Sequence, residues 1–103
     1  MVMGIVRSLR KMLRAKKRRV IGVVKIEKVI RMKDREAILG RVEKGVVRVG
    51  AILGRGRVIL IKKYREEIEF AMAGEDVFLV VEGTVGKLKG DKVEVIRPRS
   101  PIL

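Results

Sequence analysis

The feature that most constrains the fold is the segment at residues 40–50, GRVEKGVVRVG, in which a glycine separates two β-prone stretches. Apolar residues lead into it over residues 37–39, and a valine-rich stretch leaves it over residues 46–49. A three-residue loop at residues 43–45 with glycine in third place is typical of a hairpin closed by a left-handed residue in a bulge. That conformation costs other L-residues roughly 1 to 2 kcal/mol. The pattern therefore predicts a β-hairpin with Gly45 at positive φ.

The size and composition predict one small domain without catalytic chemistry. The chain has 103 residues, 48% of them hydrophobic, which suits one modest core. Cysteine and histidine are absent, which excludes disulfides, thiolate nucleophiles, imidazole bases and the usual zinc ligands. The hydroxyl groups are few: Ser8, Tyr64, Thr84 and Ser100. Without a base to activate them, we expect neither an enzyme nor a metal or cofactor site.

The residue types that are missing also indicate the setting of the protein. Asparagine and glutamine are absent while Lys, Arg, Glu, Ile and Val are abundant, which is typical of thermophiles. The longest apolar run, residues 77–81, is far shorter than the roughly 20 residues of a membrane-spanning helix. The charged N-terminal stretch does not resemble a secretory signal. We therefore expect a cytoplasmic protein from a thermophile, with no membrane span.

Positive charge is concentrated near the N-terminus. The net charge is +14, and residues 1–20 hold eight basic and no acidic residues, against 18 basic and 12 acidic in the remainder. Such an excess indicates a polyanionic partner. The eight residues are Arg7, Arg10, Lys11, Arg14, Lys16, Lys17, Arg18 and Arg19.

Residues 2–13 have the spacing of an amphipathic helix. Six apolar residues fall within an arc of about 120° when successive residues are turned by 100°: Val2, Ile5, Val6, Leu9, Met12 and Leu13. Lys16 would fall inside that arc, so the helix is expected to end between Ala15 and Arg19. The spacing leaves open whether this helix lies on the domain, on a partner protein or on RNA. We divide the chain into a helix and linker (1–20), a β-barrel (21–97) and a tail (98–103).

The remaining sequence reads as short strands. Residues 21–31 alternate, with Val24, Ile26 and Ile30 on one face, and residues 58–61 are apolar on both faces, as in a strand covered on both sides. Further strands are predicted at residues 76–82 and 91–96, with a turn at residues 73–75. Six or seven strands with turns between them indicate a small barrel or sandwich.

A strand is also predicted at residues 64–72. Its alternation places Tyr64, Ile68, Phe70 and Met72 on one face. On this pattern Tyr64 and the two phenylalanines are core residues and not platforms for stacked bases.

Three segments together resemble a known family: residues 40–50, residues 67–77 (EIEFAMAGEDV), and residues 83–93 with Gly83 and LKGDKV. They are similar to the β-barrel that follows the GTPase domain in translation factors such as elongation factor Tu and initiation factor 2. The resemblance covers about residues 21–96. It implies an all-β closed barrel of six or seven strands, of a class that often contacts tRNA, ribosomal RNA or a partner domain. Only some 20 residues precede the barrel here, so we expect it to be freestanding.

Residues 83–88, GTVGKL, resemble a phosphate-binding loop only superficially. The spacing is two residues short of GxxxxGK[ST], Leu88 replaces the hydroxyl residue that binds Mg²⁺, and a strand follows where a helix should begin. We therefore expect no nucleotide binding.

The function predicted from these observations is non-catalytic binding of RNA or the ribosome. The expected contacts are the eight N-terminal cations together with Arg41 and Arg48 of the barrel. Few aromatic residues are available to stack bases, so recognition of backbone and shape is favoured. The alternative is an interaction protein or homodimer that docks through the N-terminal helix.

Overall fold

The structure is a computed structural model that describes residues 19–98. The predicted N-terminal helix, and most of the linker and tail that flank the barrel, lie outside the described residues. Within residues 19–98 there is no helix, and so none that is long and apolar enough to cross a membrane. The strands are β1 (Val20–Arg31), β2 (Arg35–Arg48), β3 (Ile52–Leu53), β4 (Gly56–Lys63), β5 (Glu66–Ile68), β6 (Phe70–Met72), β7 (Asp76–Glu82) and β8 (Lys92–Ile96).

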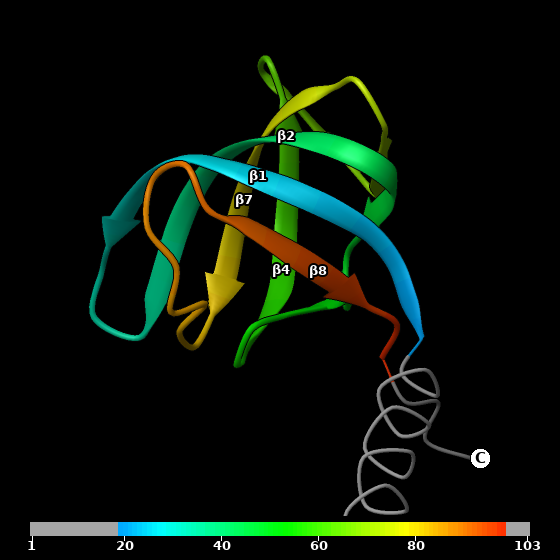
Figure 1. Cartoon of the computed structure of the whole chain (residues 1–103). Helices are drawn as coiled ribbons and strands as arrows, with labels where there is room; N and C mark the ends of the chain where they lie inside the picture. Colours follow the sequence, from blue (N-terminus) through cyan, green and yellow to red (C-terminus); the bar gives the residue numbers. More distant parts are fainter. Residues whose placement is uncertain (1–18, 99–103) are drawn as a thin grey trace, which may run out of the picture.

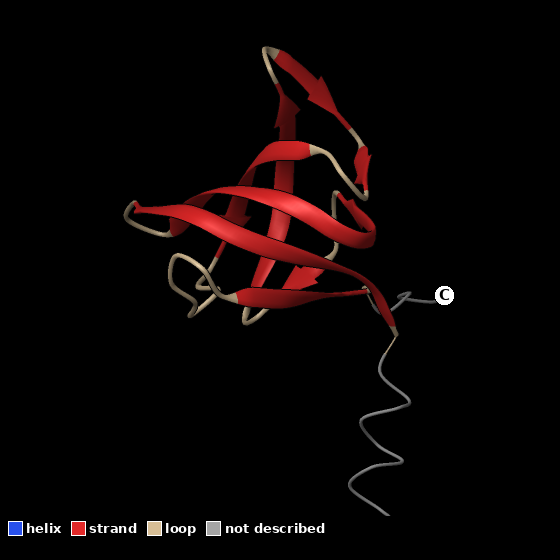
Figure 2. Cartoon of the chain, turned by 45° about the horizontal axis from the view of Figure 1, so that its top comes forward, coloured by secondary structure: helices blue, strands red, loops and turns tan. Residues whose placement is uncertain are grey.

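Six of these strands close into a barrel (Figure 1). Their order is β1, β8, β3, β4, β7 and β2, and β2 pairs again with β1 to close the ring. Every pairing is antiparallel. The short strands β5 and β6 are added to β4 and to the end of β2 (Figure 2). The predicted all-β closed barrel is therefore confirmed.

The barrel interior is filled by β-branched side chains, which pack well on a pleated surface. Each fully buried Val, Leu or Ile side chain stabilises the fold by about 1.5 to 3 kcal/mol relative to an exposed one. The core consists of Val24, Ile26, Ile38, Val42, Val47, Ala51, Leu53, Val58, Ile61, Ala71, Val77, Leu79, Val81, Val85, Val93 and Val95.

The hairpin predicted at residues 43–45 is wrong, although Gly45 does have a positive φ of 62°. Gly45 lies inside the continuous strand β2, which pairs with β1 along most of its length. Val23 pairs with Lys44 and Val24 with Val42, so Glu43 is an extra residue in a bulge. The left-handed glycine therefore bends a long strand. The hairpin turn falls earlier, between β1 and β2, where the Met32 N–H donates to the Arg35 carbonyl over 2.8 Å.

A second bulge in β1 changes which of its side chains face the core, compared with the sequence prediction. Ile26 pairs with Gly40 and Lys28 with Leu39, which leaves Glu27 without a partner in the β1–β2 pairing. One extra residue reverses the alternation of side chains. Ile30, predicted to share a face with Val24 and Ile26, is therefore exposed, and Val29 packs against the core instead.

The strand predicted at residues 64–72 is also corrected. It is divided into β5 and β6 by a bend at Glu69, and the two parts pair with different strands. Ala71 is buried, whereas Phe70 and Met72 on either side of it are exposed. Tyr64 lies in the β4–β5 turn and is 93% exposed. Neither Tyr64 nor Phe70 is a core residue.

The apolar run at residues 58–61 contains a further bulge. Val58 pairs with Val81 and Leu60 with Val80, so Ile59 is the extra residue. Val58 and Ile61 are buried, while Ile59 and Leu60 are half-buried. Leu60 belongs to the outer face of the sheet, as does the half-buried Phe78, whose partner across β2 is the exposed Leu39. Phe78 thus lies outside the core as well.

Candidate nucleic-acid interface

Three loops of the barrel lie at one end because all the strand pairings are antiparallel. β1, β3 and β7 run towards this end, and β2, β4 and β8 run away from it. The β1–β2, β3–β4 and β7–β8 connections consequently gather there (Figure 1). We call this region the loop end and define it by residues 31–36, 54–57 and 82–91.

Backbone hydrogen bonds join the three loops to one another. The Gly83 N–H donates to the Asp34 carbonyl over 3.0 Å, which links the β7–β8 and β1–β2 loops. The Arg55 N–H donates to the Thr84 carbonyl over 3.0 Å and adds the β3–β4 turn. The loops therefore form one connected surface.

Glu36 supports this surface from within. Glu36 is only 4% exposed, and it is the one buried charged residue in the part of the chain that the structure describes. Its Oε1 accepts a hydrogen bond from the Val85 N–H at 2.9 Å, and its Oε2 lies 3.3 Å from Nε of Arg31. A buried carboxylate needs such partners because an unpaired one is costly. Glu36 therefore fixes both the β7–β8 loop and the side chain of Arg31.

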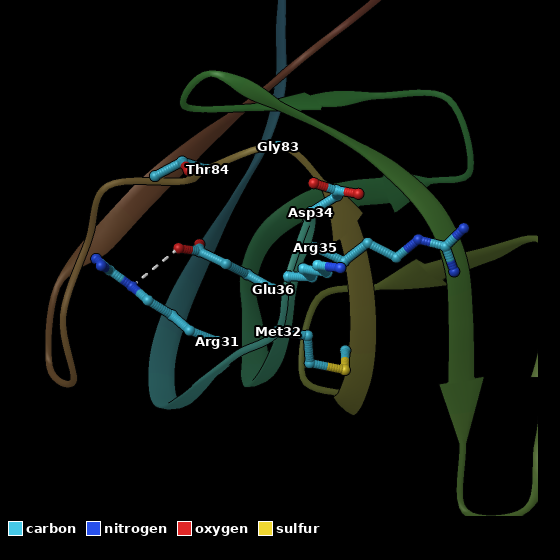
Figure 3. Close-up of a pocket in the computed structure, with 8 residues that line it drawn as sticks. Arg31, Met32, Asp34, Arg35, Glu36, Gly83 and Thr84 are labelled. Carbon is cyan, nitrogen blue, oxygen red and sulfur yellow. Dashed lines mark ion pairs between the residues drawn. The ribbon is translucent and has the colours of Figure 1, made fainter.

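A surface hollow of about 410 Å³ lies beside Glu36. Figure 3 shows Arg31 and Glu36 facing each other, joined by their ion pair, whereas the guanidinium group of Arg35 points away from them. The hollow is lined by Arg31, Met32, Lys33, Asp34, Arg35, Glu36, Gly83 and Thr84. Arg31 is already paired with Glu36 and Arg35 points away, so Lys33, the Thr84 hydroxyl and the exposed loop backbone are the groups of this lining left to hold an anion such as phosphate.

Each of the three loops carries two cations separated by one residue. These pairs lie in KDR at residues 33–35, RGR at 55–57 and KLK at 87–89. All six side chains belong to exposed residues, and none forms an ion pair with another residue of the described part. With Arg31, the loop end has seven cations and four carboxylates (Asp34, Glu36, Glu82 and Asp91), an excess of three positive charges.

The three predicted contact residues that the structure describes, Arg19, Arg41 and Arg48, lie outside the loop end. Arg41 is on the outer face of β2, where its Nε lies 3.1 Å from Oδ1 of Asp76. Arg48 lies opposite Phe70 in the β2–β6 pairing. Arg19 is exposed, and its carbonyl accepts the Arg97 N–H at 2.8 Å, where the barrel begins and ends. Arg7, Arg10, Lys11, Arg14, Lys16, Lys17 and Arg18 lie outside the described residues.

Arg19 and the loop end are at opposite ends of β1. This strand has 12 residues, and at about 3.3 Å per residue it spans roughly 35 to 40 Å. The predicted N-terminal contacts thus join the barrel far from the loop end, and the structure does not bring Arg19, Arg41 and Arg48 together with it.

The six loop cations were not singled out from the sequence, although a signal was present. A basic residue, one other residue and a second basic residue recur at three separate turns. Counting strands would have placed those turns at one end, because alternate connections of an antiparallel barrel share an end. Such a count needs the first hairpin turn to be placed between β1 and β2, whereas the sequence pattern placed it at residues 43–45.

Two other lysines of the barrel are held in internal pairs. A side-chain hydrogen bond from Lys63 to Glu75 lowers the pKa of Glu75, as does the Met72 N–H, and the same pair raises the pKa of Lys63. Lys92 lies 3.0 Å from Oε1 of Glu43 and lowers the pKa of that carboxyl mainly through its hydrogen bond. We therefore do not count Lys63 and Lys92 among the candidate contacts.

Comparison with known families identifies the barrel. The family model described as Elongation factor Tu domain 4 matches residues 19–95, which run from the residue before β1 almost to the end of β8. A comparison with curated proteins found no match. The matched domain is a non-catalytic barrel of translation factors, and the match covers well over half of the 103 residues. The chain therefore belongs to the Elongation factor Tu domain 4 family.

Proposed function

We propose that this protein is a non-catalytic RNA-binding module of translation, which contacts the phosphates of tRNA or ribosomal RNA through its loop end. The observation that carries the proposal is the gathering of three pairs of exposed cations, none of them ion-paired within the described part, on three hydrogen-bonded loops. Membership of a translation-factor domain family supports the same class of partner.

Phosphate contacts give affinity because each one releases counterions from the nucleic acid. Free cations can make such contacts without first breaking an internal ion pair. The six loop cations meet this condition within the described residues, whereas Arg41 is engaged by Asp76. The loop end is therefore a better barrel site than the outer face of β2.

The proposed mode of recognition is the shape and backbone of a structured RNA. Phosphate contacts fix position and orientation but do not read bases. Tyr64 is exposed, but it lies in the β4–β5 turn, at the end opposite the loop end. Phe70 is also exposed, on β6 beside the end of β2. Neither aromatic side chain belongs to the loop end, so base stacking is not part of the proposed contact there.

The basic N-terminal segment is expected to add contacts of its own. Arg7, Arg10, Lys11, Arg14, Lys17 and Arg18 would contribute up to about six phosphate contacts, of which roughly three or four are expected to reach one ligand. Because Arg19 lies far from the loop end, these contacts would fall on a different part of the RNA.

The test is the salt dependence of binding to a short RNA duplex. Replacing Lys33 and Arg35 by glutamine should reduce the slope of log affinity against log salt by about 0.9 for each phosphate that is no longer neutralised. The matched control is Lys62→Gln with Arg65→Gln. Those cations are also exposed and without a described ion pair, but they lie at the opposite end of the barrel. The control should leave the slope unchanged.

If the two double variants reduce the slope equally, RNA binding depends on the overall charge of the protein and not on the position of the cations. That result would refute the loop end as the interface. An unchanged slope in both would show that Lys33 and Arg35 neutralise no phosphate and would refute the β1–β2 loop as part of the interface. If the protein instead forms a dimer whose stability is indifferent to salt and binds no duplex, the alternative function as an interaction protein is favoured.

A further inference from the structure

A cluster of exposed apolar side chains lies where β6 pairs with the end of β2. Val46 is opposite Met72, and Arg48 is opposite Phe70, so these side chains share one face of the two strands. Phe70 is 56% exposed, Met72 58% and Val49 40%. We call Val46, Val49, Phe70 and Met72 the β2–β6 patch. Single exposed apolar residues are ordinary, but a contiguous group of large ones marks a surface that is covered by something else.

The patch is hollowed and has acidic neighbours. A depression of about 370 Å³ is lined by Val46, Arg48, Val49, Glu69 and Phe70. Glu66, Glu67 and Glu69 precede Phe70 and make the densest run of carboxylates in the sequence. None of the three forms an ion pair with another described residue. Glu66 and Glu67 lie opposite Lys63 and Lys62 of β4, so Glu69 is the carboxylate that borders the depression. An occupant with a large apolar face and a cation that can reach Glu69 would suit this surface.

The described chain begins next to this patch. Gly22 of β1 pairs with Gly45, the residue before Val46. Figures 1 and 2 both show the start of β1 on the same side of the barrel as the end of β2. The 18 residues that precede Arg19 contain seven cations and no carboxylate. Their sequence predicts an apolar arc over residues 2–13.

The distances allow this segment to reach the patch. The six residues from Leu13 to Arg19 can extend over roughly 20 Å, and a helix over residues 2–13 would be about 18 Å long. Arg19 precedes Gly22 by three residues, or roughly 10 Å of extended chain, and Gly22 lies opposite Gly45, the neighbour of Val46, whose partner on β6 is Met72. A linker of roughly 20 Å can therefore turn back from the start of β1 towards β6.

We propose that the N-terminal amphipathic segment, residues 2–13, folds back and docks its apolar face on the β2–β6 patch of the same chain. The apolar arc covers Phe70, Met72 and the two valines, while a flanking cation approaches Glu69. Arg7, Lys11 and Arg14, which the predicted helix places opposite the apolar arc, remain directed towards solvent.

A second apolar surface of the barrel is a poorer match for this segment. Leu39 and Phe78 are neighbours on the outer faces of β2 and β7. Lys28 lies beside Leu39, and Lys62 lies beside Phe78. Lys62 has Glu67 as its neighbour on β5, but Lys28 has no ion pair with another described residue and would repel a segment with seven positive charges. The β2–β6 depression is lined by one cation, Arg48, and one carboxylate, Glu69, so its lining carries no excess of positive charge.

The natural absence of cysteine makes the docking directly testable in the full chain. A Leu9→Cys, Met72→Cys double variant is treated with a short bis-maleimide at low protein concentration and without RNA. Linked monomers are separated from linked dimers by gel and identified by mass. Two matched controls are Lys11→Cys with Met72→Cys, which moves the thiol to the polar side of the predicted helix, and Leu9→Cys with Leu88→Cys on the exposed β7–β8 loop.

The expected result is an intramolecular link that forms severalfold faster in the Leu9→Cys, Met72→Cys variant than in either control. Adding Glu69→Gln should slow that link. Equal rates in all three double variants would refute docking at this patch. A link found mainly between chains would overturn the intramolecular proposal in favour of a second copy. Because no RNA is present, the outcome is independent of the proposed RNA-binding function.

Discussion

Gly45 of β2 lies directly opposite Gly22 of β1, and neither position has room for a side chain. A Cβ atom on Gly22 would clash with the backbone oxygen of Val46, and one on Gly45 would clash with the carbonyl oxygen of Ile21. Gly45 also has a left-handed φ of 62°. The two glycines therefore let the strands approach closely beside the bulge at Glu43.

The first prediction separates close approach from backbone conformation in this pair. Gly45→Ala combines a steric clash with an unfavourable positive φ. It should therefore destabilise the fold more than Gly74→Ala or Gly22→Ala, each of which has only one of these two causes. Gly74→Ala meets no neighbouring atom but has a φ of 94° and should cost about 1 to 2 kcal/mol. Gly22→Ala has no positive φ but overpacks the backbone, at about 1 to 3 kcal/mol. Guanidinium denaturation measures all three. A Gly45→Ala cost no larger than that of Gly74→Ala would contradict the close approach.

The same glycine shows what sequence reasoning can and cannot reach. The positive φ of Gly45 was predicted correctly, because a left-handed residue in a β-rich segment favours glycine strongly. The hairpin built on it was wrong, since β2 stays extended by pairing with β1, β7 and β6. A bulge glycine and a turn glycine have the same local sequence. Only the partner strands distinguish them.

The errors in burial have a related cause. Alternation at residues 64–72 was recognised, but the bend at Glu69 makes Ala71 the buried residue in place of Phe70 and Met72. Small residues such as Ala71 carry little hydrophobic signal, so the pattern was read in the wrong phase. The candidate site was affected in the same way. Arg41 was predicted as a contact residue, but its pairing with Asp76 depends on the β2–β7 register.

A second prediction concerns Glu36 as the support of the loop end. Glu36→Leu leaves the Val85 N–H without its acceptor and should cost about 1 to 3 kcal/mol. Glu36→Gln keeps an oxygen for that N–H and should cost less. Amide hydrogen exchange at Val85 should accelerate in the leucine variant and stay slow in the glutamine variant. Slow exchange in both would mean that the loop is held without Glu36.

A third prediction follows from the Lys63–Glu75 pair. The pKa of Glu75 is lowered in the fold, so its contribution to stability is present above its ordinary value of 4.5 and is lost as the pH falls through the lowered value. The pKa of Lys63 is raised, so its contribution is present below 10.5 and is lost as the pH rises through the raised value. The pair should stabilise the fold at neutral pH and at neither extreme.

The measurement is the melting temperature of Lys63→Met against pH, relative to the unmodified protein. The difference should be largest near neutrality, shrink towards both extremes and become smaller in high salt, because the pair is partly exposed. The control is Lys62→Met, whose lysine has no ion pair with another described residue. A difference for Lys63→Met that does not change with pH would contradict the coupling.

The last prediction concerns Tyr64, the one residue other than glycine with positive φ among residues 19–98. It occupies the first position of the two-residue turn between β4 and β5, with a φ of 60°, and its side chain is 93% exposed. Glycine is favoured at this position when the first turn residue has positive φ.

Tyr64→Gly should therefore relieve about 1 to 2 kcal/mol of strain, offset by about 0.4 to 1 kcal/mol of added entropy in the unfolded chain. The expected result in guanidinium denaturation is no loss of stability and a gain of up to about 1.6 kcal/mol. Removing a buried aromatic side chain would instead cost about 3 to 5 kcal/mol. The sign of this change thus decides between the exposed turn residue of the structure and the core residue that the alternating sequence predicted.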